Sequence, residues 1–274
     1  MDLFDAHSHV QFPAYDDNRE LVISRAQKAG VKMIAVGTQY ATSVAAINLA
    51  QKYPKAIWAA VGFHPNHLSS AWHHDLKEQP EAVPEVFDQG KFLTLARNPK
   101  CAAIGECGLD YYRLDGELAD VKTKQKEVFL SQVEIAETVK KPLMIHCRPS
   151  KGTDDAYRDI TSLLSKKVPA IMHFYVGSPE MTDILVAAGC YFTFGGVITF
   201  SRDYDESISR IPLNRLLIET DCPYVAPLSQ RGKRNEPAFI SETYRQMAKI
   251  KNLDYDSLVQ QIYQNATYVF GTEN

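Results

Sequence analysis

The stretch that decides the fold is Ala102-Ala103-Ile104-Gly105-Glu106-Cys107-Gly108-Leu109-Asp110, an apolar run that leads directly into acidic residues. Its apolar part does not alternate with polar residues, which is typical of a strand buried on both faces of a parallel sheet. The other apolar runs of this kind are Leu3–Phe4, Met33–Val36, Ile57–Val61, Leu143–Ile145, Ala170–Met172, Tyr191–Phe194 and Leu216–Ile218. With Ala102–Ile104 they make eight expected strands.

Helical patterns separate most of these runs and continue after the last one. The clearest are Asn18–Ala29, Lys122–Lys140, Pro179–Ala188, Ala238–Lys249 and Tyr255–Tyr263. A strand and a helix alternating eight times is the sequence form of a closed (β/α)8 barrel. An open doubly wound sheet is the structural alternative, but it usually has G-x-G-x-x-G after its first strand, and this chain has none. We therefore expect one TIM-barrel domain over residues 1–274.

Composition narrows the class of protein further. The 274 residues include 30 Lys+Arg and 33 Asp+Glu, giving a net charge of −3, with 45% hydrophobic residues, which excludes a disordered chain. No apolar run approaches the ~18 residues of a membrane span, and a strand expected at Leu3 leaves no room for a signal peptide. Five cysteines without a C-x-x-C pair fit a reducing compartment. We expect a cytoplasmic monomer in which any nucleic-acid contact depends on local charge.

Polar residues follow six of the eight apolar runs, always at the carboxyl end. They are His7 and His9, His64, Glu106, His146, His173, and Glu219 with Asp221. Buried ionisable groups are costly unless they are paired or bind a metal, and catalytic sites of barrels lie at this face. Any one of these histidines alone is more simply a core or loop residue. Together they predict a metal site at the C-terminal face of the strands.

The number of these side chains favours two metals over one. Even four of these histidines with two of the carboxylates exceed the needs of a single tetrahedral site. Glu106 comes from a middle strand, so it is the natural carboxylate for two ions to share. Two divalent ions carry a charge of about +4 and two carboxylates a charge of about −2. The net charge of about +2 attracts a phosphodiester. A pair of ions also lowers the pKa of a bridging water.

Other polar residues are expected to support this site. Asp5 and Glu219 share strand faces with His7 and Asp221, and we expect them to hold imidazoles by hydrogen bonds, although salt bridges within the barrel would suit them equally well. Basic residues in loops of the same face are candidates for contacts with phosphate, with a solvated surface as the alternative. These are Arg113, Arg148, Arg231, Lys233 and Arg234.

The connection Pro65–Lys100 is longer than the other connections. It is expected to be a surface excursion followed by a helix over Val83–Arg97. Its histidines, His67, His73 and His74, are expected to be solvated.

The assembled motifs resemble those of TatD-type metal-dependent deoxyribonucleases, within the amidohydrolase-like barrels. The matching stretches are Asp5–His9, Gly62–Pro65, Ile104–Tyr112, His146–Arg148, His173, Glu219–Tyr224, Arg231–Pro237 and Asn265–Ala266. They cover nearly the whole chain in order, and the combination of G-E-x-G-L-D, E-T-D-x-P and R-N-E-P is highly specific. The chain departs from the usual pattern of these proteins in two places, and both bear on substrate preference. One is Phe174–Ser178, where C-F-S-G-S is more usual, and the other is the long Pro65–Lys100 excursion.

The resemblance implies a ligand set and an activity. One metal would be held by His7, His9, Glu106 and Asp221, and the second by Glu106, His146 and His173. The catalytic residues would be Asp221, Glu106 and His64, with Asp221 accepting a proton from water and His64 close to the metals without being a principal ligand. The implied activity is 3′-to-5′ exonuclease action on DNA, at single strands or 3′ ends, with Mg²⁺, Mn²⁺ or Zn²⁺.

Two other readings of the same residues stay open. A hydrolase of a small-molecule amide, lactone or phosphoester could use the same ligands on the same scaffold, because a fold does not fix a substrate. A non-catalytic metal-binding or scaffold protein is the other alternative, but such a protein would be expected to lack part of the ligand set. The basic stretch Arg231–Arg234 favours a polyanionic substrate.

Overall fold

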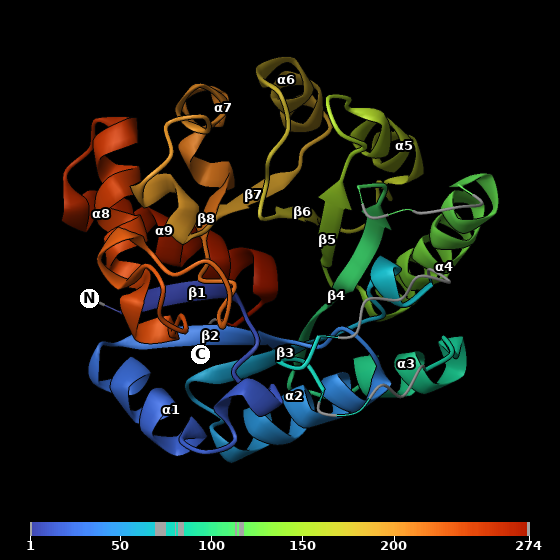
Figure 1. Cartoon of the computed structure of the whole chain (residues 1–274), viewed down its shortest axis with the longest axis horizontal. Coiled ribbons are helices and arrows are strands. Elements are labelled where there is room, and N and C mark those ends of the chain that lie inside the picture. The colour runs from blue at the N-terminus through green and yellow to red at the C-terminus, as the bar shows by residue number, and fades with distance from the viewer. Residues whose placement is uncertain are drawn as a thin grey trace.

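Eight parallel strands form a nearly closed barrel in the computed structural model, which describes residues 2–68, 75–79, 81, 85–112, 114 and 118–272. The strands are β1 (Leu3–Ser8), β2 (Val31–Val36), β3 (Ile57–Val61), β4 (Cys101–Asp110), β5 (Leu143–Arg148), β6 (Ala170–His173), β7 (Tyr191–Phe194) and β8 (Leu216–Ile218). Each strand pairs with the next one along the chain. Figure 1 shows the strands as a ring with helices on its outside. The predicted barrel is confirmed.

The helices that cover the ring follow the predicted alternation. They are α1 (Arg19–Lys28), α2 (Tyr40–Lys52), α3 (Gln89–Ala96), α4 (Leu118–Val139), α5 (Asp155–Leu163), α6 (Pro179–Ala187), α7 (Asp205–Arg210), α8 (Ile240–Lys251) and α9 (Tyr255–Phe270). Helix α3 begins later than the expected Val83, because the Asp88 side chain accepts a hydrogen bond from the Lys91 amide and caps the first turn. Val83 itself lies outside the described residues. None of the helices in the described part of the chain has the length and apolar character needed to cross a membrane.

The inside of the barrel is apolar at the end where the strands begin. Phe4 at the start of β1 stacks on Phe270 of α9, with ring centres 5.8 Å apart, and on Trp58 of β3, with ring centres 6.1 Å apart. Ile34, Met144 and other buried side chains complete this inner cluster. Because apolar residues fill this end, the buried polar groups collect at the other end, where the strands finish.

The seam between β1 and the chain after β8 is closed by backbone hydrogen bonds. The Asp221 amide donates to the His7 carbonyl over 2.9 Å, and the His9 amide donates to the Cys222 carbonyl over 2.8 Å. The beginning and the last quarter of the chain therefore meet at the level where His7, His9 and Asp221 lie.

Strand β4 runs well beyond the predicted Ala102–Ile104 and carries Glu106 in its middle. Two glycines let it lie very close to β5. A Cβ atom at Gly108, whose φ is +136°, would lie 2.0 Å from the His146 carbonyl oxygen, and one at Gly105 would lie 2.5 Å from the carbonyl oxygen of Met144. Any side chain at these positions would push the two strands apart, so the glycines keep Glu106 near His146.

Candidate metal centre

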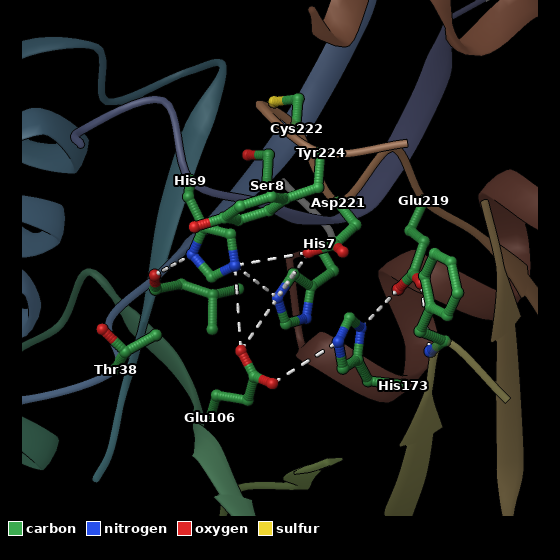
Figure 2. A network of polar contacts seen from close by, with 12 residues as sticks. His7, Ser8, His9, Thr38, Glu106, His173, Glu219, Asp221, Cys222 and Tyr224 are labelled. Atoms are coloured by element: carbon green, nitrogen blue, oxygen red, sulfur yellow. Dashed lines mark hydrogen bonds and ion pairs between the residues drawn. The ribbon is translucent and has the colours of Figure 1, made fainter. Parts of the chain in front are cut away.

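Glu106 lies at the centre of the site and turns each of its two oxygens toward a different pair of imidazoles (Figure 2 shows three of these four rings). Its Oε2 lies 3.4 Å from His7 Nε2 and 3.7 Å from His9 Nε2. Its Oε1 lies 3.0 Å from His146 Nδ1 and 3.5 Å from His173 Nε2. The nitrogens of His7 and His9 are themselves only 3.0 Å apart. One carboxylate thus separates two groups of nitrogen donors.

Asp221 completes the group on the Oε2 side. Its Oδ1 lies 3.4 Å from His9 Nε2 and 3.7 Å from His7 Nε2. The backbone of Asp221 is left-handed, with φ of +52°, and Phe174, directly after His173, has φ of +44°. Such conformations are strained for residues with a Cβ atom and concentrate at functional sites. Here they turn the chain sharply where a polar side chain must face the barrel axis.

Two of the histidines are oriented through the ring nitrogen that faces away from Glu106. His9 Nδ1 lies 2.7 Å from the Val36 carbonyl oxygen, so Nδ1 must carry the proton and donate it. His173 Nδ1 lies 3.0 Å from Glu219 Oε2 and donates in the same way. In both rings Nε2 is the nitrogen left to bind an ion, an arrangement common among metal-bound histidines.

Asp110, for which no role was predicted, does the same for His146. Its Oδ2 lies 3.1 Å from His146 Nε2, so that Nδ1 is the nitrogen that faces Glu106. Asp110 follows Glu106 by four residues in the same strand, and residues an even number apart share a strand face. That spacing was the signal that could have identified it.

His64 differs from the other histidines because the lone pair of its unprotonated ring nitrogen already accepts a hydrogen bond from the backbone. Its Nδ1 accepts a hydrogen bond from the Asn66 amide over 3.1 Å, so the proton resides on Nε2, 3.2 Å from Glu106 Oε1. Burial lowers the pKa of His64, which favours the neutral ring. In this state His64 donates a hydrogen bond toward the centre instead of offering it a lone pair.

The charges of the cluster depend on one another. Burial alone would raise the pKa of Glu106, but the surrounding imidazoles, His64 and His173 foremost, hold it well below its usual range. Burial would lower the pKa of His173, but the carboxylates of Glu219 and Glu106 outweigh it and raise the pKa to about 10. Burial lowers the pKa of His7 to about 4. Protons on the more basic imidazoles thus occupy positions that a cation could take.

The donor set fits a metal centre. Among the described residues, His7 Nδ1 is buried and has no hydrogen-bond partner. Groups of side chains whose donor atoms lie within 4.8 Å of one another are His7 with His9 and Glu106, His64 with Glu106 and His146, and His7 with His173 and Glu219. Buried imidazole and carboxylate donors of this kind suit zinc, manganese and related divalent ions.

The basic residues predicted from the sequence are dispersed. Arg148 lines the pocket in front of the cluster, and its guanidinium lies 4.1 Å from the centre of the Tyr112 ring. Arg231 stacks 4.3 Å from the centre of the Phe200 ring, and neither Arg231 nor Lys233 is among the residues that line this pocket. Arg113 lies outside the described residues.

Two predicted roles differ from what the structure shows. Arg234 donates to the Ala14 carbonyl oxygen and to Asn18 Oδ1, and therefore ties the loop after β8 to the start of α1 instead of facing the pocket. Asp5 accepts hydrogen bonds from the Thr220 amide at 2.9 Å and the Thr220 hydroxyl at 2.6 Å, and holds the barrel seam instead of an imidazole. In both cases backbone and hydroxyl groups nearby provided partners that strand alternation does not reveal.

A pocket of about 530 Å³ opens in front of Glu106 and Asp221. The excursion after β3 contributes His67, Asp75 and Glu78 to its wall. The expectation that His67 is solvated is wrong, because its side chain is only 3% exposed and its Nε2 lies 3.0 Å from a Glu78 oxygen. His73 and His74 lie outside the described residues.

A (β/α)8 barrel with buried imidazoles and carboxylates at the carboxyl ends of its strands defines the class of metal-dependent barrel hydrolases. The family described as TatD related DNase matches residues 4–271. An uncharacterized metal-dependent hydrolase, YabD of Bacillus subtilis, is 34% identical over 98% of both chains. A protein of Pectobacterium parmentieri named 3′-5′ ssDNA/RNA exonuclease TatD is 32% identical over 98% of this chain and 99% of its own. The chain belongs to the TatD family of metal-dependent hydrolases.

Solved structures agree with this assignment. YJJV, a TatD homolog from Escherichia coli, superimposes with a TM-score of 0.81 at 25% identity over 98% of both chains. An uncharacterized amidohydrolase from Saccharomyces cerevisiae has a TM-score of 0.76 at 18% identity, covering 98% of this chain and 100% of its own. This second likeness is one of fold alone.

Proposed function

We propose that this protein is a metal-dependent 3′-to-5′ exonuclease that removes nucleotides from the ends of single-stranded DNA. The observation that carries the proposal is the position of Glu106, whose two oxygens face two separate groups of imidazoles. The name of the Pectobacterium relative, 3′-5′ ssDNA/RNA exonuclease TatD, supports the substrate class.

The proposed ligands fall into two groups that share Glu106. His7, His9, Glu106 and Asp221 would hold one divalent ion, and Glu106, His146 and His173 the other. When bound, two such ions neutralise charge on phosphate oxygens and lower the pKa of the attacking water. Magnesium, manganese and zinc are the candidates, with the nitrogen-rich donor set favouring the last two.

The protein's own side chains supply proton transfer and charge. Burial would raise the pKa of Asp221, but His9 and the other imidazoles outweigh it and lower the pKa, so the carboxylate is ionised and can accept a proton from water. His64 presents its Nε2–H toward the centre and would donate a hydrogen bond to a phosphate oxygen. Arg148 at the pocket rim would pair with a phosphate.

The test uses metal-stripped protein and a single-stranded DNA oligonucleotide labelled at its 5′ end. Adding Mg²⁺, Mn²⁺ or Zn²⁺ should restore a ladder of labelled products that shorten by one nucleotide at a time. Glu106→Gln should lose both bound metal and at least about 100-fold in kcat/KM, because one partner of each ion is weakened. Full metal-dependent turnover by Glu106→Gln would show that the shared carboxylate is not needed.

The same protein is assayed against a panel of small amides, lactones and phosphomonoesters. Hydrolysis of one of these, with oligonucleotides left intact, would replace the nuclease by the small-molecule hydrolase.

A further inference from the structure

One wall of the pocket is acidic, although the pocket leads to a centre proposed to act on phosphate. Asp75 and Glu78, which we call the acidic wall, line the same pocket as Glu106 and Asp221. Arg148 lines that pocket too and brings a positive charge to it. The surroundings of a bound substrate therefore include both signs of charge outside the metal ligands.

Both residues of the acidic wall are held firmly in place. Glu78 contacts His67 Nε2 over 3.0 Å and accepts a hydrogen bond from the Thr38 hydroxyl. Asp75 accepts a hydrogen bond from the Tyr224 hydroxyl over 2.8 Å. Figure 2 shows Thr38 and Tyr224, the anchors of the two acids, bordering the histidines of the centre. A further backbone bond, from the Ala14 amide to the Lys77 carbonyl, fixes the segment between the two acids.

The acidic wall does not belong to the metal centre. Neither of its residues is in the groups of described side chains that could hold an ion. Burial would raise the pKa of Glu78, but its contact with His67 outweighs burial and the pKa is lowered, so Glu78 is negatively charged at neutral pH. Its side chain is 13% exposed, so the charge lies within the pocket and is poorly screened by water.

The charge of this wall distinguishes two kinds of neighbouring group on a substrate. A second phosphate placed against Asp75 or Glu78 would be repelled, because like charges in a partly buried site interact strongly. A sugar hydroxyl at the same place can donate a hydrogen bond to a carboxylate. The acidic wall therefore favours a strand that ends in a sugar hydroxyl, and disfavours a strand that continues with another phosphate.

We propose that the acidic wall is a subsite for the last nucleoside of the strand, which recognises its free 3′ hydroxyl and excludes both a 3′ phosphate and an uninterrupted strand. This inference rests on the proposed function and deepens it, because it gives the reason for cutting from an end. It also assigns a role to the long excursion after β3, which supplies both acids.

The experiment compares three single-stranded DNA substrates of one sequence: linear with a 3′ hydroxyl, linear with a 3′ phosphate, and circular. The wild-type protein, Glu78→Gln and Asp75→Asn are assayed with the metal that supports the highest turnover. Glutamine keeps the hydrogen bonds to His67 and Thr38 while removing the charge. Glu81→Gln is the matched control, because Glu81 is an exposed acid of the same segment that does not line the pocket.

We expect the wild-type protein to prefer the 3′ hydroxyl substrate over the 3′ phosphate substrate by at least about tenfold in kcat/KM. Glu78→Gln should lower this ratio about tenfold, Asp75→Asn should lower it as well, and Glu81→Gln should leave it unchanged. Because the readout is a ratio measured within each variant, a general loss of activity does not imitate the effect. Metal content and circular dichroism confirm that each variant is folded and loaded.

The outcomes separate the inference from the proposed function. The protein could degrade DNA from the 3′ hydroxyl end while neither substitution changes the preference for a 3′ hydroxyl over a 3′ phosphate. That result would refute the role of the acidic wall but not the proposed exonuclease activity. Cleavage of circular DNA as fast as linear DNA by the wild-type protein would also overturn the wall, and would make the protein an endonuclease. A wild-type protein that degrades none of the three substrates would remove the proposed function, and the inference with it.

Discussion

At the scale of single residues, the metal centre is prepared by partners behind the histidines. The Val36 carbonyl, Asp110 and Glu219 each accept a hydrogen bond from the ring nitrogen that faces away from Glu106. Each partner therefore fixes both the tautomer and the orientation of a ring before an ion arrives. Substitutions at these partners should affect the binding of metal more than the stability of the fold.

Asp110→Asn tests this directly. The asparagine oxygen can still accept the hydrogen bond from the Tyr112 amide, but its NH₂ group would face His146 Nε2 and favour the proton on Nδ1. We expect metal affinity, measured by calorimetry, to fall about 10- to 100-fold. The number of ions bound per protein molecule should then fall when the protein is diluted. Asp159→Asn, which changes an acid paired with Lys126 outside the pocket, is the control. Unchanged metal affinity in Asp110→Asn would contradict the role of Asp110.

Metal affinity should also depend on pH with a definite sign. The pKa of His173 is raised to about 10 by Glu219 and Glu106 against the effect of burial, so in the metal-free protein this ring is protonated at neutral pH. Binding an ion through Nε2 requires that proton to leave, so affinity should rise with pH by about tenfold per unit for each proton released. Calorimetry with Mn²⁺ in buffers of different ionisation enthalpy counts the protons. In Glu219→Gln the rise should shift to lower pH, and a flat profile in the wild-type protein would refute the argument.

At the scale of elements, the spacing of β4 and β5 sets the site. Gly108→Ala would place a methyl group 2.0 Å from the carbonyl oxygen of His146, in a backbone of φ +136° that alanine disfavours. We expect a loss of roughly 2 kcal/mol or more in the free energy of unfolding, together with weaker metal binding, because β5 must move. Chemical denaturation of metal-free protein measures the first quantity.

The control for this variant is Gly152→Ala. Gly152 has φ of +75° and open space around the position of a Cβ atom, so its substitution carries the backbone cost without the clash. If the two variants were equally stable, close packing of the strands would not be the reason for the glycine at position 108.

The sequence was sufficient to predict elements whose side chains carry the signal. Runs such as Met33–Val36 and Ile57–Val61 match β2 and β3 closely, because a strand buried on both faces must be apolar throughout. The prediction stopped short in β4, where Ala102–Ile104 is only part of a strand that ends at Asp110. Beyond Ile104 the strand continues through glycines and an acid, and their pairing with β5 depends on the backbone, which hydrophobic patterns do not report.

The site divides in the same way. The side chains at strand ends were predictable, because parallel strands bring their carboxyl ends to one face whatever the loops do. The acidic wall was not, because Glu78 meets Thr38 and Asp75 meets Tyr224 only after the excursion folds back over the barrel. The partners of Arg234 were hidden for a similar reason, since they lie 220 and 216 residues away along the chain.

At the scale of the whole molecule, removing metal should lower the stability of the entire barrel. An ion present at 100 times its Kd adds ~2.7 kcal/mol to the native state, and each 1 kcal/mol shifts the Tm of a protein of this size by about 2–4 °C. A chelator should therefore lower the Tm by roughly 5–10 °C, and excess Mn²⁺ should restore it in differential scanning calorimetry. The same treatment of Glu106→Gln should produce a much smaller shift. An unaltered Tm in the wild-type protein would mean that these side chains bind no ion tightly.

The seam between β1 and the chain after β8 has a consequence for biosynthesis. His7 leaves the ribosome early, but the backbone group that fixes it and the carboxylate beside it belong to Asp221, more than 200 residues later. A nascent chain therefore lacks Asp221, one of the proposed ligands, until most of the protein has been translated. A truncated product that ends before this seam lacks the full set of side chains beside Glu106, so we expect tight metal binding to begin only when synthesis is nearly finished.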